Sequence, residues 1–287
     1  MKSRYNLGLV LEGGASRTYY TCGILDRMLD DNIATDYVIG TSAGIANGVS
    51  YISKQRGRNY IIGTQYLQDK RYMGMKHLLL KKSGCYYNLD FVFDEIPNKL
   101  LPFDYDAFAE FKGAVVAAVT NIETGAAEYL DVSRYDRKCM ALRASCALPI
   151  LFKPIEVDGK LYMDGGICDS IPIDHALSSG CEKAVVILTQ PRDYRKRPDK
   201  SLELSAKIYR KYPQFAKALL DRPRVYNENL EEIARLEKQG KVFVIAPKTA
   251  LGVKRTEKNP HEIKRIYNLG VEDYDTVREN LLKFIGG

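Results

Sequence analysis

One serine in the chain stands among small residues, in the pattern Gly40-Thr41-Ser42-Ala43-Gly44 between an apolar strand-like run and a helix-like segment. A nucleophile elbow turns so sharply that its flanking residues must be small, which Gly40, Ala43 and Gly44 satisfy. The turn lifts the hydroxyl to the N-terminus of the next helix, where free N–H groups favour negative charge. Ser42 is therefore a candidate nucleophile; the alternative is an N-cap serine on an ordinary turn.

A serine hydroxyl reacts only when a base takes its proton. The chain has three scattered histidines, none in a segment suited to that role: His77, His175 and His261. A carboxylate must then serve, and Asp164 stands at the end of an apolar strand-like run before Gly165 and Gly166, which allow a tight turn. Because an ordinary aspartate pKa near ~3.9 makes a weak base, we expect Asp164 to be partly desolvated and close to Ser42. The alternative is a turn-forming aspartate.

A third element, Glu12-Gly13-Gly14-Ala15-Ser16-Arg17, follows the first apolar run. Consecutive flexible residues can direct several N–H groups to one place, and such a nest holds an oxyanion or equally a phosphate. Neither G-x-x-x-x-G-K-[ST] nor G-x-G-x-x-G is present. The scattered histidines, and six cysteines without CxxC or metal-ligand spacing, favour a mechanism with no metal and no cofactor.

In this order and with these spacings, the three motifs resemble the patatin-like phospholipase family. That family has a Gly-rich oxyanion loop followed by Lys or Arg, a GxSxG elbow, and a D-G-[GA] motif on a Ser–Asp dyad. The segments Gly23–Leu25 and Ala144–Pro149 also look like its segments. The resemblance covers residues 6–190, and beyond them the chain resembles bacterial members with a helical C-terminal extension.

The resemblance implies a role for each matching position. Ser42 would be the nucleophile and Asp164 its base, and an oxyanion would form against the loop from Gly13 to Ala15. The N–H groups of Gly14 and Ala15 would receive it, with Arg17 nearby and a further N–H from Ala43. No nucleic acid partner is expected.

The sequence departs from the family pattern at two positions of this loop, with Ala15 and Thr18 where glycines are usual. An alanine keeps its N–H, so an oxyanion hole can survive the change. If the position requires a positive φ, the strain costs ~1–3 kcal/mol and activity is expected to be weakened or the hole altered.

The expected activity is that of a lipid acyl hydrolase, of phospholipase A or lysophospholipase type, acting through an acyl-enzyme. Two alternatives stay open: a general carboxylesterase or thioesterase with the same dyad, and a weakly active lipid-binding module that retains the fold. Aromatic and apolar residues of the region 60–110 are candidates for an acyl groove, with core packing as their alternative: Tyr60, Tyr66, Leu78, Leu79, Leu80, Tyr86 and Phe91.

Short apolar runs separated by helical patterns predict the elements that must position these residues. Strands are expected at 6–12, 36–40, 113–119, 184–188 and 242–246, and hairpins at 126–131 and at 155–157 with 160–163 around Asp158-Gly159. Helices are expected at 20–30, 43–53 and 138–147. Alternating strands and helices predict a three-layer α/β fold with a mostly parallel central sheet.

Because a buried-type strand returns at 242, we expect one domain over residues 1–287. Its core would cover 6–190, a helical insertion 190–240, and the last strand with C-terminal helices 241–287. No export signal, membrane anchor or run of ~18 apolar residues is visible, and the cysteines read as reduced core thiols, so a cytoplasmic location is expected.

The net charge of +7 is uneven along the chain. Residues 53–82 carry eight Lys/Arg against one acid, and residues 192–224 carry eleven against four. Such segments are suited to peripheral contact with an anionic membrane surface, for which Lys76, Lys81 and Lys82 are candidates. The alternative is an ordinary solvated face.

Overall fold

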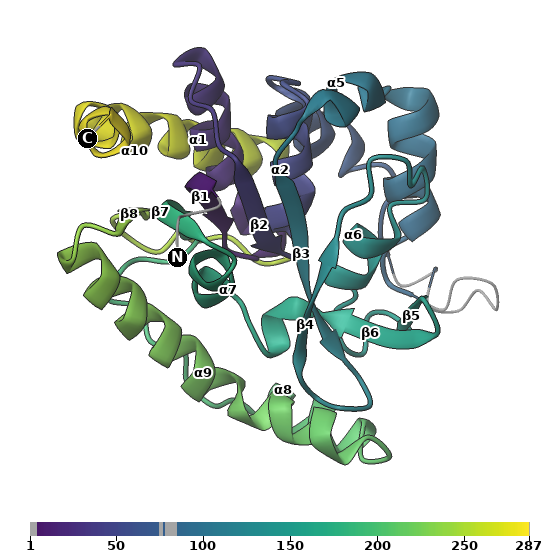
Figure 1. Ribbon diagram of the computed structural model, residues 1–287. Coiled ribbons are helices and arrows are strands. Elements are labelled where there is room, and N and C mark those ends of the chain that lie inside the picture. The colour runs from purple at the N-terminus through teal and green to yellow at the C-terminus, as the bar shows by residue number, and fades with distance from the viewer. Residues whose placement is uncertain (1–4, 75–76, 78–84, 287) are drawn as a thin grey trace.

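A central sheet with helices on both faces organises the computed structural model, which describes residues 5–74, 77 and 85–286 (Figure 1). The strands follow the order β5-β6-β3-β2-β1-β7-β8, and β4 also pairs with β3. They are β1 (Tyr5–Leu11), β2 (Tyr37–Thr41), β3 (Ala114–Asn121), β4 (Ala127–Asp131), β5 (Ile155–Val157), β6 (Lys160–Asp164), β7 (Cys181–Ile187) and β8 (Val242–Ile245). Strands β8, β7, β1, β2 and β3 pair in parallel, whereas β4, β5 and β6 join in antiparallel pairs.

Helices cover both faces of this sheet. The longer ones are α1 (Tyr19–Asp30), α2 (Ala43–Ile52), α9 (Pro213–Lys238) and α10 (Pro260–Gly286). The shorter segments are η1 (Ala15–Thr18), α3 (Arg58–Ile61), η2 (Ile62–Tyr66), η3 (Phe91–Leu100), α5 (Tyr105–Glu110), α6 (Met140–Ser145), η4 (Gly165–Ile167), α7 (Ile173–Ser178) and α8 (Lys200–Ile208). The predicted α/β architecture with a central sheet between helices is confirmed.

Alternate side chains of β1 enter the two halves of the core. Leu9 and Leu11 pack in a cluster beneath α1, α2 and α10, whereas Val10 packs in a second cluster beneath α7 and α9. A strand buried on both faces reads as a continuous apolar run, which is the pattern that predicted β1.

The two predicted hairpins are confirmed. Strand β4 pairs antiparallel with β3, and β5 with β6. Asp158 and Gly159 between β5 and β6 have φ values of 49° and 76°, as a two-residue turn with two positive φ angles requires. In the described part of the region 55–112, for which no strand was predicted, the extended pairing is an isolated bridge between Met73 and Tyr87.

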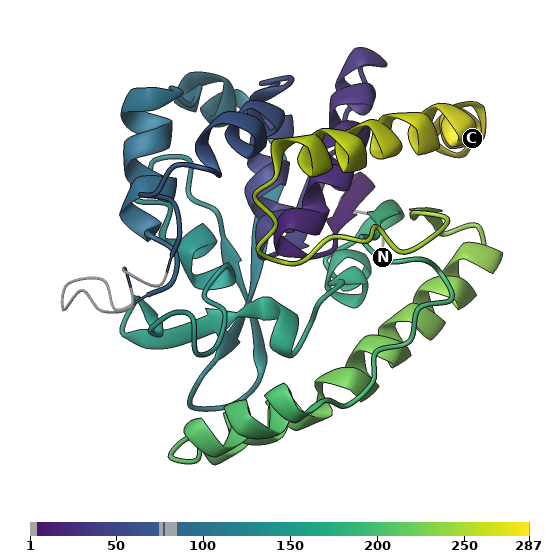
Figure 2. The ribbon, with the colours of Figure 1, turned by 180° about the vertical axis from the view of Figure 1, so that it is seen from behind.

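The C-terminal part of the chain returns to the sheet. After α8 and α9, strand β8 pairs with β7 at the sheet edge, and α10 then lies beside α1 (Figure 2). Glycines let the two helices approach closely, because a Cβ at Gly23 would lie 2.1 Å from the Tyr267 carbonyl oxygen and one at Gly270 equally close to that of Tyr20.

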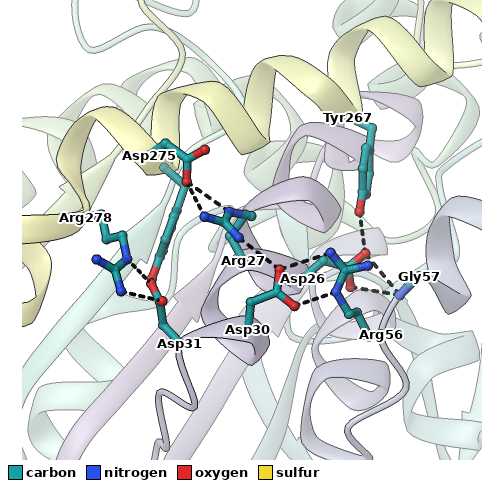
Figure 3. A network of polar contacts seen from close by, with 10 residues as sticks. Asp26, Arg27, Asp30, Asp31, Arg56, Gly57, Tyr267, Asp275 and Arg278 are labelled. Carbon is teal, nitrogen blue, oxygen red and sulfur yellow. Dashed lines mark hydrogen bonds and ion pairs between the residues drawn. The ribbon is translucent and has the colours of Figure 1, made fainter.

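Ion pairs and hydrogen bonds link the C-terminal end of α1 with the middle of α10 and the loop after α2 (Figure 3). Their members are Asp26, Arg27, Asp30, Asp31, Arg56, Gly57, Tyr267, Tyr274, Asp275 and Arg278. Single exposed ion pairs contribute little, so this network chiefly fixes the register of α10 on α1.

Within the described ranges, no helix has both the length and the apolar character that crossing a bilayer requires.

Candidate functional site

Two strands meet end to end along one edge of β3. Thr41, the last residue of β2, pairs with Ala118, and Asp164, the last of β6, pairs with the next residue, Val119. Strand β4 occupies the other edge over the same stretch. Because β2 is parallel and β6 antiparallel to β3, their carboxyl ends converge. The pairing therefore brings Ser42, directly after β2, next to Asp164.

The backbone at Ser42 has the sharp turn expected of an elbow. Its φ of 55° and ψ of −134° lie where residues other than glycine are rarely found, and Ser42 is 8% exposed. Neighbouring positions have no room for side chains: a Cβ at Gly44 would lie 2.7 Å from the carbonyl oxygens of Leu11 and Glu12, and one at Gly40 2.9 Å from that of Leu11. Close packing against the end of β1 is thus the reason for the small residues.

A second serine holds the elbow in place. The Ser42 N–H donates to the Ser145 hydroxyl oxygen at 2.8 Å, and the Ser145 hydroxyl donates to the Ala118 carbonyl at 2.7 Å. Ser145 thus bridges β2 and β3 at the point where their ladder ends. It lies in the segment Ala144–Pro149 that resembles the family, but no pattern in the sequence predicted this role.

Asp164 is a buried carboxyl group with one oxygen engaged. Its Oδ1 accepts from the Gly166 N–H at 2.8 Å, whereas its buried Oδ2 has no hydrogen-bond partner within the described residues. Burial raises the pKa of Asp164, while the adjacent Ser42 hydroxyl, the Gly166 N–H and the positive charge of Arg222 oppose that rise. The expected proximity of Ser42 to a desolvated carboxyl group is what the structure has, without a full hydrogen bond between them.

The Gly-rich loop after β1 offers free backbone donors. The Gly13 N–H is engaged, since it donates to the Ser170 carbonyl at 3.4 Å. The N–H groups of Gly14 and Ala15 donate no hydrogen bond to the described parts of the chain. Ala43 begins α2, where first-turn N–H groups have no partner inside the helix.

The two departures from the family pattern have different consequences. Ala15 adopts a φ of 48°, so the condition for backbone strain at this position is met. Thr18 has an ordinary helical conformation with φ of −70°, and its hydroxyl donates to the Ala15 carbonyl at 2.8 Å. Strain is therefore expected from Ala15 alone.

Glu12 anchors this loop from beneath. It is 2% exposed and accepts hydrogen bonds from the Thr189 N–H at 2.6 Å and the Tyr226 hydroxyl at 2.8 Å. Burial raises the pKa of Glu12, and these donors together with the charge of Arg17 counteract the rise. The Nε of Arg17 is buried without a hydrogen-bond partner in the described structure.

An apolar cavity of about 200 Å³ opens at Ser42. Aliphatic and aromatic side chains from α2, η3, α6 and the neighbouring loops dominate its walls, among them Val49, Leu89, Val92, Phe93, Leu142 and Phe152. The elements that form it all precede residue 153.

The predicted acyl-groove residues lie elsewhere. Tyr60, Tyr66, Tyr86 and Phe91 are not among the residues that line the cavity, and Leu78 to Leu80 lie outside the described residues. Tyr60 packs on Tyr267 with ring centroids 4.7 Å apart, and Phe91 is 1% exposed in the core. The prediction was wrong for these four: on η3, Val92 and Phe93 line the cavity in place of Phe91, and Tyr86 packs on the cavity-lining Tyr87.

A second, smaller recess of about 30 Å³ lies on another side of Ser42. Ala15, Ser42 and Leu148 line both spaces. Four cations line the recess together with Glu12 and Asp164: Arg17, Lys196, Arg222 and Arg255. Of these four, the sequence analysis assigned only Arg17 to the site. Lys196 and Arg222 belonged to the basic segment 192–224, and Arg255 had no distinguishing pattern.

The three histidines, His77, His175 and His261, line neither space. His175 stacks on Tyr129 with centroids 3.7 Å apart, and His77 is buried with its Nε2 3.0 Å from the Lys70 carbonyl oxygen. All six cysteines are free. Lys76, Lys81 and Lys82 fall outside the described residues.

The fold and the meeting of β2 with β6 define an α/β protein with a sharp strand–turn–helix at Ser42. A family model described as "Patatin-like phospholipase" matches residues 9–177, and the chain belongs to this family. A second family model, "Domain of unknown function (DUF6363)", matches residues 212–286. The mixed sheet with flanking helices agrees with the first match.

Curated relatives match a little less than two thirds of the chain. "Uncharacterized protein YjjU" of Escherichia coli is 27% identical over 199 residues, which cover 64% of this chain and 52% of that protein. "Lysophospholipase nte1" of Aspergillus niger is 26% identical over 186 residues, 62% of this chain and 11% of that protein. The chain thus spans about half the length of the first relative and about a tenth of the second.

Proposed function

We propose that this protein hydrolyses carboxylic esters of lipids, with Ser42 as nucleophile and Asp164 as its base. The observation that carries the proposal is the buried Asp164 Oδ2, which lacks a hydrogen-bond partner in the described structure beside the strained Ser42 turn at the mouth of an apolar cavity. A structural aspartate would have its buried oxygens satisfied. Family membership and the lysophospholipase names of distant relatives support a lipid substrate.

In the proposed reaction, Ser42 Oγ bonds to the ester carbonyl carbon while its proton passes to Asp164. The carbonyl oxygen becomes an oxyanion that accepts from the N–H groups of Gly14, Ala15 and Ala43. The tetrahedral species then expels the alcohol oxygen, which takes the proton from Asp164, and an acyl-serine remains. Water attacks this ester with Asp164 again accepting a proton, and release of the fatty acid restores Ser42.

The apolar cavity is the proposed site of the acyl chain. Its walls include Ala43, directly after the nucleophile, and Ala46, one turn further along α2, and they continue to Val92 and Phe93. Each buried methylene contributes ~0.8 kcal/mol, so a chain of several carbons would anchor the substrate without polar contacts. The lysophospholipase or phospholipase A type of activity fits such a chain-binding cavity.

The tip formed by α8 and the start of α9 is the proposed membrane contact. Leu204, Ile208 and Leu220 are 57%, 53% and 50% exposed there, in the predicted basic segment. The Ile150 N–H donates to the Tyr209 hydroxyl at 3.1 Å, which connects the tip with the cavity-lining segment around Leu148. Leu204→Glu with Ile208→Glu should weaken binding to anionic liposomes about tenfold in a sedimentation assay, and undiminished binding would exclude the tip.

Hydrolysis of p-nitrophenyl butyrate by wild-type protein and by Ser42→Ala tests the activity. We expect loss of at least about a thousandfold in kcat/KM, since the nucleophile is removed. Ser178→Ala, an exposed serine on α7, is the matched control and should retain wild-type turnover. Equal turnover by Ser42→Ala would remove Ser42 as the nucleophile.

A further inference from the structure

The recess beside Ser42 brings together cations from separate parts of the chain that follows the patatin-like match. Lys196 lies in the loop after β7, Arg222 on α9, and Arg255 in the loop between β8 and α10. With Arg17, four positive side chains line a space whose other charged members are Glu12 and Asp164. Four cations against two acids leave an excess of positive charge, which favours binding of an anion because like charges repel at close range.

Specific hydrogen bonds hold the three segments that carry Lys196, Arg222 and Arg255. Arg222 Nε donates to the Gly166 carbonyl, and the Asn227 side chain exchanges hydrogen bonds with the Lys196 backbone at 2.9 and 3.0 Å. The N–H and the hydroxyl of Ser16 both donate to the Arg255 carbonyl, at 3.2 and 2.8 Å. The loops are therefore fixed to the Gly-rich loop and to α9, which favours a built site over a chance meeting of surface chains.

The attraction of Glu12 for Arg17 and Lys196, and of Asp164 for Arg222, acts without a close ion pair. No ion pair joins Arg17, Lys196, Arg222 or Arg255 to an acid within the described residues, and the buried Nε of Arg17 has no acceptor there. Burial, followed by the positive charges of Arg222 and Arg255, lowers the pKa of Lys196 to about 7. Burial likewise lowers the pKa of Arg222, and Arg255 adds to the effect.

We propose that Lys196, Arg222 and Arg255, with Arg17, form a subsite for the phosphate group of the substrate, so that the region after residue 177 selects lipid esters with a net-negative head group. The subsite rests on the proposed hydrolysis at Ser42. This residue lines both the recess and the apolar cavity. A lipid ester bound across Ser42 has its acyl chain in the cavity and its phosphate in the recess. A phosphate without a cationic substituent matches the four cations, whereas choline would bring a fifth positive charge among them.

Two variants test the subsite, Lys196→Met and Arg255→Met, because each removes a charge and keeps a long side chain. Arg222 is avoided because its contact with Gly166 also supports the segment of Asp164. The matched control is Arg197→Met, an exposed cation next to Lys196 that does not line the recess.

The first measurement is the ratio of kcat/KM for lysophosphatidic acid to that for lysophosphatidylcholine. We expect wild type and Arg197→Met to favour the anionic lipid, and the ratio to fall about tenfold in each test variant. An unchanged ratio overturns the subsite while leaving the proposed hydrolysis intact.

The second measurement needs no turnover. In the Ser42→Ala background, sn-glycerol 3-phosphate should raise the Tm relative to glycerol at equal ionic strength, and Lys196→Met or Arg255→Met should reduce that shift. Without the ligand, Lys196→Met should raise the Tm, because repulsion among the cations is relieved; a residue with a purely structural role would lower it. Equal shifts in all variants, or none in Ser42→Ala itself, overturn the proposal.

Competition distinguishes a head group from a free anion. sn-Glycerol 3-phosphate should raise the KM of wild type for lysophosphatidic acid. Binding that leaves this KM unchanged would assign the recess to a free phosphate and overturn the head-group role. Phosphate binding in a protein that hydrolyses no ester would refute the proposed function and leave the anion site standing.

Discussion

The two spaces that meet at Ser42 differ in chemistry and in origin. The larger cavity is apolar, and all of its lining residues lie between Ala15 and Phe152, inside the region that matches the patatin-like family. The smaller recess is cationic, and three of its four cations lie beyond residue 177. The first space is thus formed within the family match, whereas the second depends on the part of the chain that follows it.

The difference teaches how an extension can alter a site without altering its chemistry. Along one face of α9, Arg222 contacts Gly166, Tyr226 contacts Glu12, and Asn229 contacts Asp169. These three positions lie about one helical turn apart and so reach the segment after Asp164 and the Gly-rich loop together. The extension therefore holds the segment after Asp164 and the Gly-rich loop in place, and it also supplies positive charge to the recess.

The largest expected effect comes from the carboxyl group that both spaces share. Asp164→Asn should reduce kcat/KM roughly 100- to 10,000-fold for neutral and anionic esters alike, because the amide cannot accept the Ser42 proton. Parallel assays on p-nitrophenyl butyrate and lysophosphatidic acid measure it. A loss of kcat/KM for only one of the two substrates would contradict a role of Asp164 as the common base for both.

The next effect should be confined to the apolar side. Ala46→Phe places a ring in the cavity one turn after Ser42, and should reduce kcat/KM for long-chain p-nitrophenyl esters about 10- to 100-fold while acetyl esters lose little. A chain-length series from C2 to C16 measures the change, with Ala46→Leu as a milder variant. Equal loss at all lengths would indicate damage to the elbow and not a blocked cavity.

A smaller effect is expected on the pH dependence of kcat/KM, because the cations of the recess act on the pKa of Asp164. Asp164 acts as a base only when it is deprotonated, so kcat/KM should rise with pH through a pKa above the ordinary aspartate value, since burial raises it. The charges of Arg222 and Arg255 counteract that rise. Arg255→Met should therefore move the acidic limb of the profile to higher pH, and Arg197→Met should not. A shift to lower pH would contradict this electrostatic link.

The smallest expected effect is on stability. Ala15→Gly should raise the free energy of unfolding by about 0.5–1 kcal/mol, because glycine adopts the φ of 48° without steric cost. Urea unfolding measures it. The same change at Ala216, in helix α9, should instead lower the free energy by about 1 kcal/mol. A loss at Ala15 would show that the alanine is not strained there.

Patterns local in sequence predicted the strands and the turn at Ser42 better than the lining of either space. Strands such as β1 and the turn at Asp158-Gly159 follow from buried runs and turn residues, and the elbow follows from five adjacent residues. The pairing of Thr41 and Asp164 with neighbouring positions of β3 explains why two motifs 122 residues apart converge. Motif order and spacing indicated that convergence only through the family resemblance.

The cationic recess was not predictable from any single segment. Lys196, Arg222 and Arg255 are separated by 26 and 33 residues and stand in charged loops and helices of ordinary composition. Only the pairing of β8 with β7 and the path of α9 bring them together. The prediction of acyl-groove residues was wrong for a related reason. Composition indicated the right region, but it could not show that Phe93 lines the cavity and Phe91 does not.

Labelling with a long-chain alkyl fluorophosphonate, followed by mass spectrometry of the digested protein, tests the reactive hydroxyl at the meeting point of the two spaces most directly. The reagent should modify Ser42 in wild-type protein and react far more slowly with Asp164→Asn. A label on another residue, such as Cys146 in the same cavity, or an equal rate of modification in Asp164→Asn, would contradict the account.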